Sequence, residues 1–426
     1  MTTVVVVGFF ALALLGMPLA FALGFSALAA MWVGDVEWLV FPQRMMYALN
    51  AFPLLAIPCF MVAGELMVEG GIMDRLIALA NSLVGRVRGG LAHVTVVSAA
   101  SLAAVSGTAV ADATALTSTM MPSLEKYYSR GFGAALIAAA ANLGPIIPPS
   151  AAMIVYAYMA GPSVSVGALF IAGVVPGIIL AIAMMGWSTW VARRENFPPT
   201  GDAFSLVRFL ATLRRSAIVV AMPVVVIGGI VGGLFTATEG SAIAVVYALV
   251  IGLFVTKRVK LSSLPGVLFR AALTTGVVGA LIAFASAVTY LLTIDMVPAH
   301  LAAWVQGVTS DPTMFIVLVM VVLVVAGMFL ESNAAYIMLV PLLAPIAQGY
   351  GIDPIYFGFL FVLNLVIGML TPPVGVLLFV VSSAAGIRIG DLTRHALPFI
   401  AIQFAVLALC IAFPAVVTTL PRWLGY

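Results

Sequence analysis

A Gly-x-x-x-Pro-Pro sequence occurs twice in this chain, each time inside a long apolar run. The first copy runs from Gly144 to Pro149 and the second from Gly368 to Pro373. Two consecutive prolines remove two amide donors from a helix and leave carbonyl oxygens without their helical partners. A helix that faces lipid cannot satisfy these groups, so such a break must be surrounded by protein or line a water-filled cavity. Broken helices at matching places in two halves of a membrane chain indicate a binding site of the kind found in secondary transporters.

The composition also predicts a membrane protein. Hydrophobic residues make up 64% of the chain and charged residues 8%, whereas a soluble globular domain has about 25% charged residues. Apolar runs of about 20 residues recur along the sequence, which is the length of a transmembrane helix, whereas transmembrane strands would be about 10 residues long with alternating polarity. We therefore expect an all-α integral membrane protein that crosses the lipid bilayer several times. The net charge of +3 arises from basic residues in short loops, so it predicts no nucleic-acid partner.

Features around the two Gly-x-x-x-Pro-Pro copies repeat in the same order, which indicates an internal duplication. In each half a long apolar segment with a small, polar centre precedes the break. Such a segment favours a re-entrant hairpin, in which two half-helices meet at an unwound tip. The predicted ranges are a first repeat at 1–200 (hairpin about 91–121, broken helix about 131–160), a linker at 201–215, and a second repeat at 216–426 (hairpin about 312–345, broken helix about 355–385).

The distribution of charge predicts the orientation of the two repeats. With the N-terminus outside, all of the 18 lysines and arginines except Arg44 and Arg422 fall on the cytoplasmic side. Basic residues in short loops favour that side. The acidic loop at Asp35 and Glu37 corresponds to a basic loop at 257–260 in the second half. The repeats are therefore expected to have inverted topologies, with the first hairpin entering from the cytoplasm and the second from outside.

Two hairpin tips that meet two broken helices would surround a polar site near the middle of the membrane. Carbonyls at helix C-termini, together with hydroxyls, suit a small cation, and amides at helix N-termini suit an anionic substrate group. An alternative is that the small residues only allow close helix packing. The predicted residues are Ser106, Gly107, Thr108, Asn142, Gly144, Pro148, Pro149 and Ser150 for a first cation site; Glu331, Ser332, Asn333, Gly368, Thr371 and Pro372 for a second; and Ser106, Pro149, Ser150, Asn333 and Pro373 for the substrate.

Several carboxylates lie at or near membrane depth, where a charge is costly and usually functional. Glu331 is expected to bind a cation, contact the substrate, carry a proton or cap its own half-helix. Asp112, which follows the first tip, is interpreted as the N-cap of the returning half-helix rather than as a ligand. Glu239 is interpreted as a cap or an inter-helix contact, and Glu65 and Glu69 as residues near the interface.

Enzymatic chemistry is not indicated. The sequence contains no Walker-type Gly-x-x-x-x-Gly-Lys-Ser/Thr. A hydrolase within the membrane would need a nucleophile beside a base, and His93 lies 13 residues from Ser106. The three histidines lack metal-ligand spacing, and Cys59 and Cys410 lie in separate apolar runs, which favours free thiols. We expect no enzyme activity and no cofactor. Paired closed hairpins also favour a gated carrier over a continuous channel.

The two Gly-x-x-x-Pro-Pro copies, Ser106-Gly107-Thr108 and the sequence from Gly232 to Glu239 together resemble the large membrane subunit of tripartite ATP-independent periplasmic (TRAP) transporters. The resemblance spans the whole chain. It departs from the family pattern at Thr108-Ala109, where a second serine is common after the glycine, and this places one hydroxyl ligand of the first cation site in question.

The resemblance implies a sodium-coupled importer of a small organic acid in the bacterial inner membrane, with a transport domain that moves by an elevator mechanism on a scaffold. It also implies two partners, a small four-helix membrane subunit and a periplasmic binding protein that delivers the substrate. The alternative is a carrier of the same hairpin class that works without a binding protein and is coupled to sodium or protons. Hydroxyl-rich tips and the resemblance favour sodium as the coupling ion.

Overall fold

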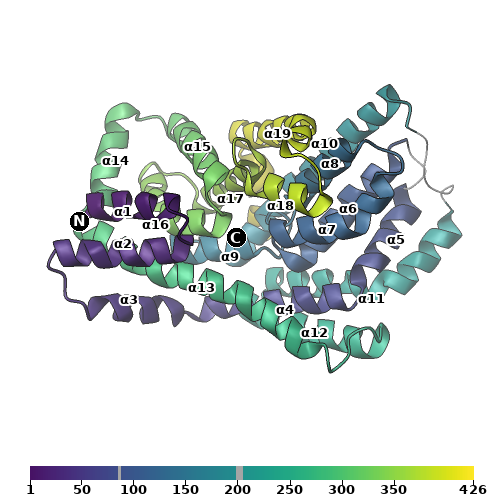
Figure 1. Cartoon of the computed structure of the whole chain (residues 1–426), viewed down its shortest axis with the longest axis horizontal. Coiled ribbons are helices and arrows are strands. Elements are labelled where there is room, and N and C mark those ends of the chain that lie inside the picture. Colours follow the sequence, from purple (N-terminus) through teal and green to yellow (C-terminus); the bar gives the residue numbers. More distant parts are fainter. Residues whose placement is uncertain (85–87, 198–204) are drawn as a thin grey trace.

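The computed structural model describes residues 1–84, 88–197 and 205–426 (Figure 1). Every regular element among these residues is a helix and none is a strand, which confirms the all-α prediction. An α-helix satisfies its own backbone donors and acceptors, as a chain in hydrocarbon requires.

The first half contains ten α-helices and one 3₁₀-helix in the described residues. Gly16, whose φ is +87°, and Pro18 separate the first two helices, because a positive φ and a missing amide donor both end a helix. The elements are α1 (Thr2–Leu14), α2 (Leu19–Val33), α3 (Val40–Leu49), η1 (Phe52–Leu55), α4 (Ala56–Glu69), α5 (Ile72–Val84), α6 (Gly90–Ser106), α7 (Ala109–Leu124), α8 (Arg130–Ala141), α9 (Ala151–Ala160) and α10 (Val166–Arg194).

A helix begins inside the segment 201–215 that was predicted as a linker. Residues 206–215, predicted as linker, belong to α11, because Ser205 caps that helix and apolar residues at helical spacing follow it. Residues 201–204 of the predicted linker lie outside the described residues. The elements are α11 (Leu206–Val231), α12 (Ala237–Val250), a π-helical turn η2 (Ile251–Val255), α13 (Leu264–Ile294), α14 (Val297–Val308), α15 (Pro312–Phe329), α16 (Ser332–Gly349), α17 (Pro354–Leu370), α18 (Val376–Ala385), α19 (Ile389–Ala412) and α20 (Ala415–Trp423).

Six helical segments of the described chain are long and apolar enough to cross a membrane, or seven if the bent α11 is counted as one span. Shorter apolar helices flank the helix breaks, among them α8, α9, α17 and α18. The six segments are Phe52–Glu69, Val166–Arg194, Ala237–Val255, Leu264–Ile294, Pro312–Phe329 and Ile389–Ala412.

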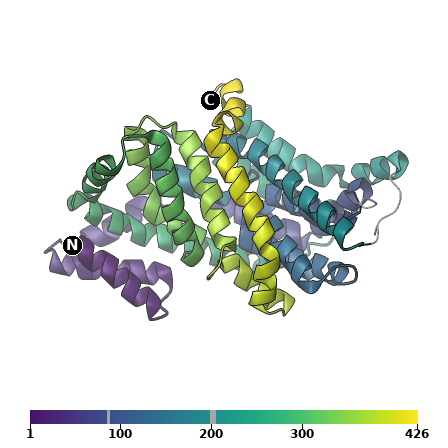
Figure 2. The ribbon, with the colours of Figure 1, turned by 90° about the horizontal axis from the view of Figure 1, so that it is seen from above.

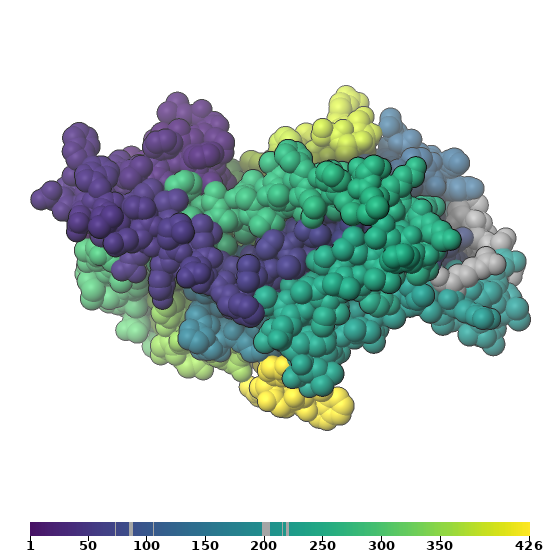
Figure 3. All heavy atoms as spheres, turned by 90° about the horizontal axis from the view of Figure 1, so that it is seen from below, coloured from purple at the N-terminus to yellow at the C-terminus, as the bar shows by residue number. Residues whose placement is uncertain are grey.

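Helices of the first half pack against helices of the second half. Helix α7 packs on α18 and α16 on α9, while α4 packs on α12 and α2 on α13. Figure 1 shows α3, α4, α12 and α13 along one side of the molecule, and the helices at the two breaks lie above them. In Figure 2 the yellow α19 lies beside α17, and the N-terminal helices lie at the far end. The face in Figure 3 is formed largely by the teal and green segments of α11 to α13 beside the purple N-terminal segments.

Candidate functional site

The turn between α6 and α7 lies against the break between α8 and α9. Gly107 has a φ of +63°, which favours glycine. A Cβ atom at Gly107 would lie 2.6 Å from the carbonyl oxygen of Pro149 and 3.1 Å from the amide nitrogen of Ala151. Position 107 therefore requires glycine, because its backbone is left-handed and because the backbone of the helix break lies too close for a side chain.

The same contact is made from the side of the break. A Cβ atom at Gly144 would lie 2.6 Å from Oδ2 of Asp112 and 2.9 Å from the carbonyl carbon of Thr108. Ser150 caps α9, because its Oγ accepts a hydrogen bond from the amide of Met153 at 3.3 Å and donates one to the carbonyl of Pro145 at 2.7 Å. The hydroxyl of Ser150 is thus engaged within the break itself. The eight residues predicted for the first cation site all lie in the tip or in the segment from Asn142 to Ser150.

The interpretation of Asp112 as an N-cap was wrong. The N-cap of α7 is Thr108, because the left-handed turn at Gly107 lets the helix begin at Ala109. Asp112 is fully buried in the first turn, and its Oδ1 accepts a hydrogen bond from Oγ of Ser106. Its Oδ2 lies against Gly144 and has no hydrogen-bond partner among the described residues. Asp112 therefore belongs to the candidate site, and its sequence position beside a polar tip, at predicted membrane depth, is the signal that could have identified it.

In the second tip, Glu331 bonds mainly to its own neighbours in the chain. Glu331 is the N-cap of α16, and its carboxylate accepts hydrogen bonds from the amides of Asn333 at 3.1 Å and Ala334 at 3.3 Å. It also accepts from Nδ2 of Asn333 at 2.9 Å and from Oγ of Ser332 at 3.3 Å. Of the roles considered for Glu331 from the sequence, capping its own half-helix is the one that these contacts display.

The second break is attached to its hairpin through α15. Gly368 packs directly on Gly327, and a Cβ atom at Gly368 would lie 2.7 Å from Cα of Gly327. The amide of Gly375 donates a hydrogen bond to the carbonyl of Met328 at 3.0 Å, and Thr371 Oγ1 donates to the carbonyl of Ile367 at 2.7 Å. Sequence reasoning did not identify these contacts of Gly327 and Gly375.

The residues predicted to contact substrate differ in accessibility. Pro373 is exposed, Ser106 and Asn333 are half-buried, and Pro149 and Ser150 are buried. The peptide bonds Pro148-Pro149 and Pro372-Pro373 are both cis. Among the predicted substrate residues, a molecule approaching from outside the protein could therefore reach Ser106, Asn333 and Pro373.

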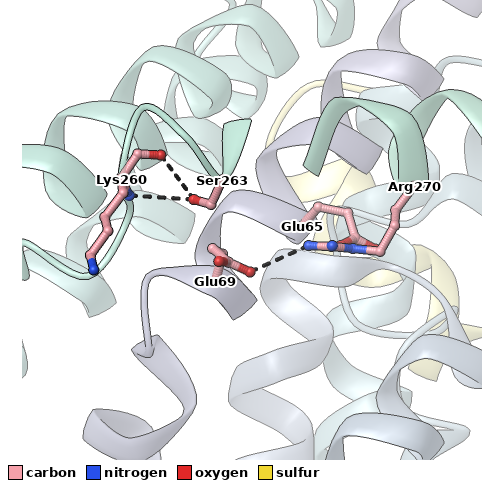
Figure 4. Close-up of polar contacts among 5 residues, drawn as sticks. All are labelled: Glu65, Glu69, Lys260, Ser263 and Arg270. Carbon is pink, nitrogen blue, oxygen red and sulfur yellow. Dashed lines mark hydrogen bonds and ion pairs between the residues drawn. The ribbon is translucent and has the colours of Figure 1, made fainter. Parts of the chain in front are cut away.

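Other polar residues singled out from the sequence lie in contacts away from the tips. Arg270 of α13 pairs with two carboxylates of α4, with Nε at 2.7 Å from Oε2 of Glu65 and Nη2 at 3.4 Å from Oε2 of Glu69 (Figure 4). Glu239 forms a capping box with Thr236 at the start of α12, as one of its two interpretations anticipated. These carboxylates therefore have structural partners, and the candidate site is confined to the tips and breaks.

The oxygen atoms at the first tip suit a small hard cation. The hydroxyl of Ser106, the unpartnered Oδ2 of Asp112 and the carbonyls of the break are the donor type that such cations prefer. Within the part of the chain that the structure describes, no group of three or more His, Cys, Asp or Glu residues could hold a metal ion. A cation at this tip would therefore be bound mainly by backbone and hydroxyl oxygens.

The sequence is similar to those of known transporter permeases. Residues 6–416 match the family described as "Tripartite ATP-independent periplasmic transporter, DctM component". The C4-dicarboxylate TRAP transporter large permease protein DctM of Pseudomonas aeruginosa is 40% identical over 88% of this chain and 87% of its own length. The sialic acid TRAP transporter large permease protein SiaM of Vibrio cholerae is 35% identical over 98% of each chain.

Solved structures with a similar fold include a transporter. The YdaH transporter of Alcanivorax borkumensis matches with a TM-score of 0.58 over 88% of this chain and 87% of that chain, at 14% identity. The relatives are named as permease proteins of transporters rather than as enzymes, in agreement with the absence of enzymatic motifs. The family match spans almost the whole sequence, and the chain belongs to the family of DctM components of tripartite ATP-independent periplasmic transporters.

Proposed function

We propose that this chain is the membrane permease of a secondary active importer that couples inward movement of sodium to uptake of a small organic acid. The observation that carries the proposal is the close packing of the α6–α7 turn on the first helix break, with Gly107 against Pro149 and Gly144 against Asp112. This packing brings oxygen atoms of Ser106, Asp112 and the break together. A buried carboxylate oxygen without a partner is unfavourable, and a bound cation would relieve it. C4-dicarboxylates and sialic acid, named for two relatives, are both organic acids.

The sodium gradient can supply the energy. A monovalent cation that crosses about 100 mV inward contributes about 2.3 kcal/mol. At about 1.4 kcal/mol per tenfold change, one cation supports roughly 50-fold accumulation of substrate. Two cation sites, one at each pair of tip and break, would support a higher accumulation of substrate. The importer would then need no nucleotide site as a source of energy.

The proposed movement is an elevator in which hairpins and broken helices travel as one body along a scaffold. Matched contacts support two inverted repeats. Helix α7 packs on α18 as α16 packs on α9. The pairing of Arg270 with Glu65 has a counterpart in Arg44, whose guanidinium lies 4.0 Å from the ring centroid of Tyr290. The sequence spacing from Arg44 to Arg270 equals that between the two Gly-x-x-x-Pro-Pro copies to within a few residues. We place the N-terminus in the periplasm and the chain in the bacterial inner membrane.

Two partners complete the proposed importer, a small four-helix membrane subunit and a periplasmic protein that delivers the substrate. Uptake into proteoliposomes tests the whole assembly. The proposal predicts accumulation only with an inward sodium gradient and with both partners present. Accumulation that needs no binding protein would instead support the independent carrier, and accumulation that follows a proton gradient without sodium would contradict sodium coupling.

A further inference from the structure

A buried amide connects the two helix breaks. Asn142 is the C-cap of α8 and stands two residues before Gly144. Its Nδ2 donates one hydrogen bond to the carbonyl of Val366 at 3.0 Å and another to Oε1 of Gln403 at 2.9 Å. Val366 belongs to α17 and stands two residues before Gly368. A single side chain at the start of the first break therefore contacts the last turn before the second break.

Gln403 holds this amide in place from a third helix. It lies on α19, is fully buried, and its Nε2 donates a hydrogen bond at 3.4 Å to the carbonyl of Ala139 on α8. Asn142 is also fully buried, and its Oδ1 has no hydrogen-bond partner among the described residues. Buried hydrogen bonds between amides are unfavourable to break without replacement. A displacement of the end of α8 would therefore strain or break its hydrogen bonds to α17 and α19.

A second buried asparagine provides a contrast. Asn364 of α17 also donates its Nδ2 to a backbone carbonyl, that of Met320 on α15, at 2.6 Å, and its Oδ1 is also unpartnered. Its bond joins two helices of the second half, whereas the bonds of Asn142 join the first half to the second. The two residues have the same chemistry and burial but different connections.

We propose that Asn142 and Gln403 are positioning residues that couple the two cation sites, so that occupation of one site raises the affinity of the other. The inference rests on the proposed sodium sites. A cation that orders the first break fixes the end of α8, and the bonds of Asn142 then fix the turn of α17 that leads into Thr371. Coupling of this kind between two sites is typically 5-fold to 150-fold in affinity.

Hydrogen exchange measures the protection of the two breaks separately. It is followed for the full chain in detergent during a sodium titration at constant ionic strength. Amides in 142–150 report on the first site and amides in 371–375 on the second. Ser106→Ala removes a hydroxyl from the first site, and it is expected to raise the sodium midpoint of segment 371–375 at least about fivefold. In Gln403→Leu the sodium midpoint of segment 371–375 is expected to be higher than in the unmodified chain. Adding Ser106→Ala to Gln403→Leu is expected to change this midpoint less than twofold.

Asn364→Leu is the matched control, because it removes a buried amide from α17 without cutting the connection between the halves. In that background Ser106→Ala is expected to keep its remote effect. Should Gln403→Leu fail to fold, Gln403→Met is the second variant. An equal remote effect of Ser106→Ala with and without Gln403 would overturn the coupling while leaving the sodium sites standing. If sodium protects neither segment of the unmodified chain, the proposed function fails and the coupling fails with it.

Discussion

The hydroxyl of Ser106 donates a hydrogen bond to the carboxylate of Asp112 within the turn that joins α6 to α7. The bond occupies one carboxylate oxygen, and the other faces the backbone near Gly144. A tip built in this way presents to the same helix break a hydroxyl and a carboxyl oxygen that has no hydrogen-bond partner among the described residues. The proposed cation site depends on this arrangement.

Asp112→Asn is expected to reduce the stabilisation of the chain by sodium, because it removes a ligand of the first of the two proposed sites. The substitution keeps the shape of the side chain and replaces a buried carboxyl group, one oxygen of which has no hydrogen-bond partner among the described residues, so the thermal midpoint without sodium should stay the same or rise. Midpoints in detergent with and without sodium measure both effects. A sodium response of unchanged size would show that the carboxylate takes no part in cation binding.

Gly107→Ala is expected to destabilise the chain by at least about 1–2 kcal/mol, because a side chain in the left-handed region is strained and its Cβ would meet the carbonyl of Pro149. Gly276→Ala is the control. Gly276 lies inside α13 with nothing within 4 Å of an added Cβ, so alanine there should stabilise the helix by about 0.5–1 kcal/mol. Thermal midpoints of the two variants should therefore shift in opposite directions. Equal shifts would contradict close packing of Gly107 on the first helix break.

Glu331→Gln is expected to lower the thermal midpoint modestly and to preserve the sodium response. The carboxylate accepts four hydrogen bonds within its own tip, and loss of an N-cap typically costs about 1 kcal/mol. The same sodium titration measures the outcome. Loss of the sodium response in this variant would assign Glu331 to the second cation site rather than to a capping role.

Arg270→Gln and Arg44→Gln test the contacts of α13 with α4 and α3. The ion pairs of Arg270 are partly exposed, so each variant should lose no more than about 1 kcal/mol of stability. Both variants should keep the sodium response of the unmodified chain, because neither arginine touches a tip. A selective loss of sodium binding in either would place that arginine in the cation site.

The sequence was most informative about the local breaks. Consecutive prolines and a polar tip are local signals, and the structure has helix ends at Ser106, Ala141, Phe329 and Leu370, within or beside the predicted breaks. One helix cap was assigned wrongly. Asp112 was assigned to a cap because the sequence does not show that a left-handed glycine starts the next helix at Ala109.

Long-range partners could not be predicted. Gln403 stands 261 positions from Asn142, and no local pattern marks it as the acceptor of that amide. The packing of Gly368 on Gly327 likewise depends on how α15 and α17 cross. Contacts of this kind arise from tertiary packing, and only the structure identifies them.

The most direct test of the central claim is thermal unfolding of the purified chain in sodium against potassium or choline, at constant ionic strength and pH. A ligand that binds the native state raises the thermal midpoint by mass action. When the sodium concentration exceeds the dissociation constant, each further tenfold increase in that concentration adds about 1.4 kcal/mol per bound ion to the free energy of unfolding. The predicted result is a sodium-selective rise that is smaller in Ser106→Ala, because the first site is lost and the second site is weakened. The full rise should persist in Ser101→Ala, whose hydroxyl bonds only within α6. Equal midpoints in sodium and potassium would contradict the proposed sodium sites.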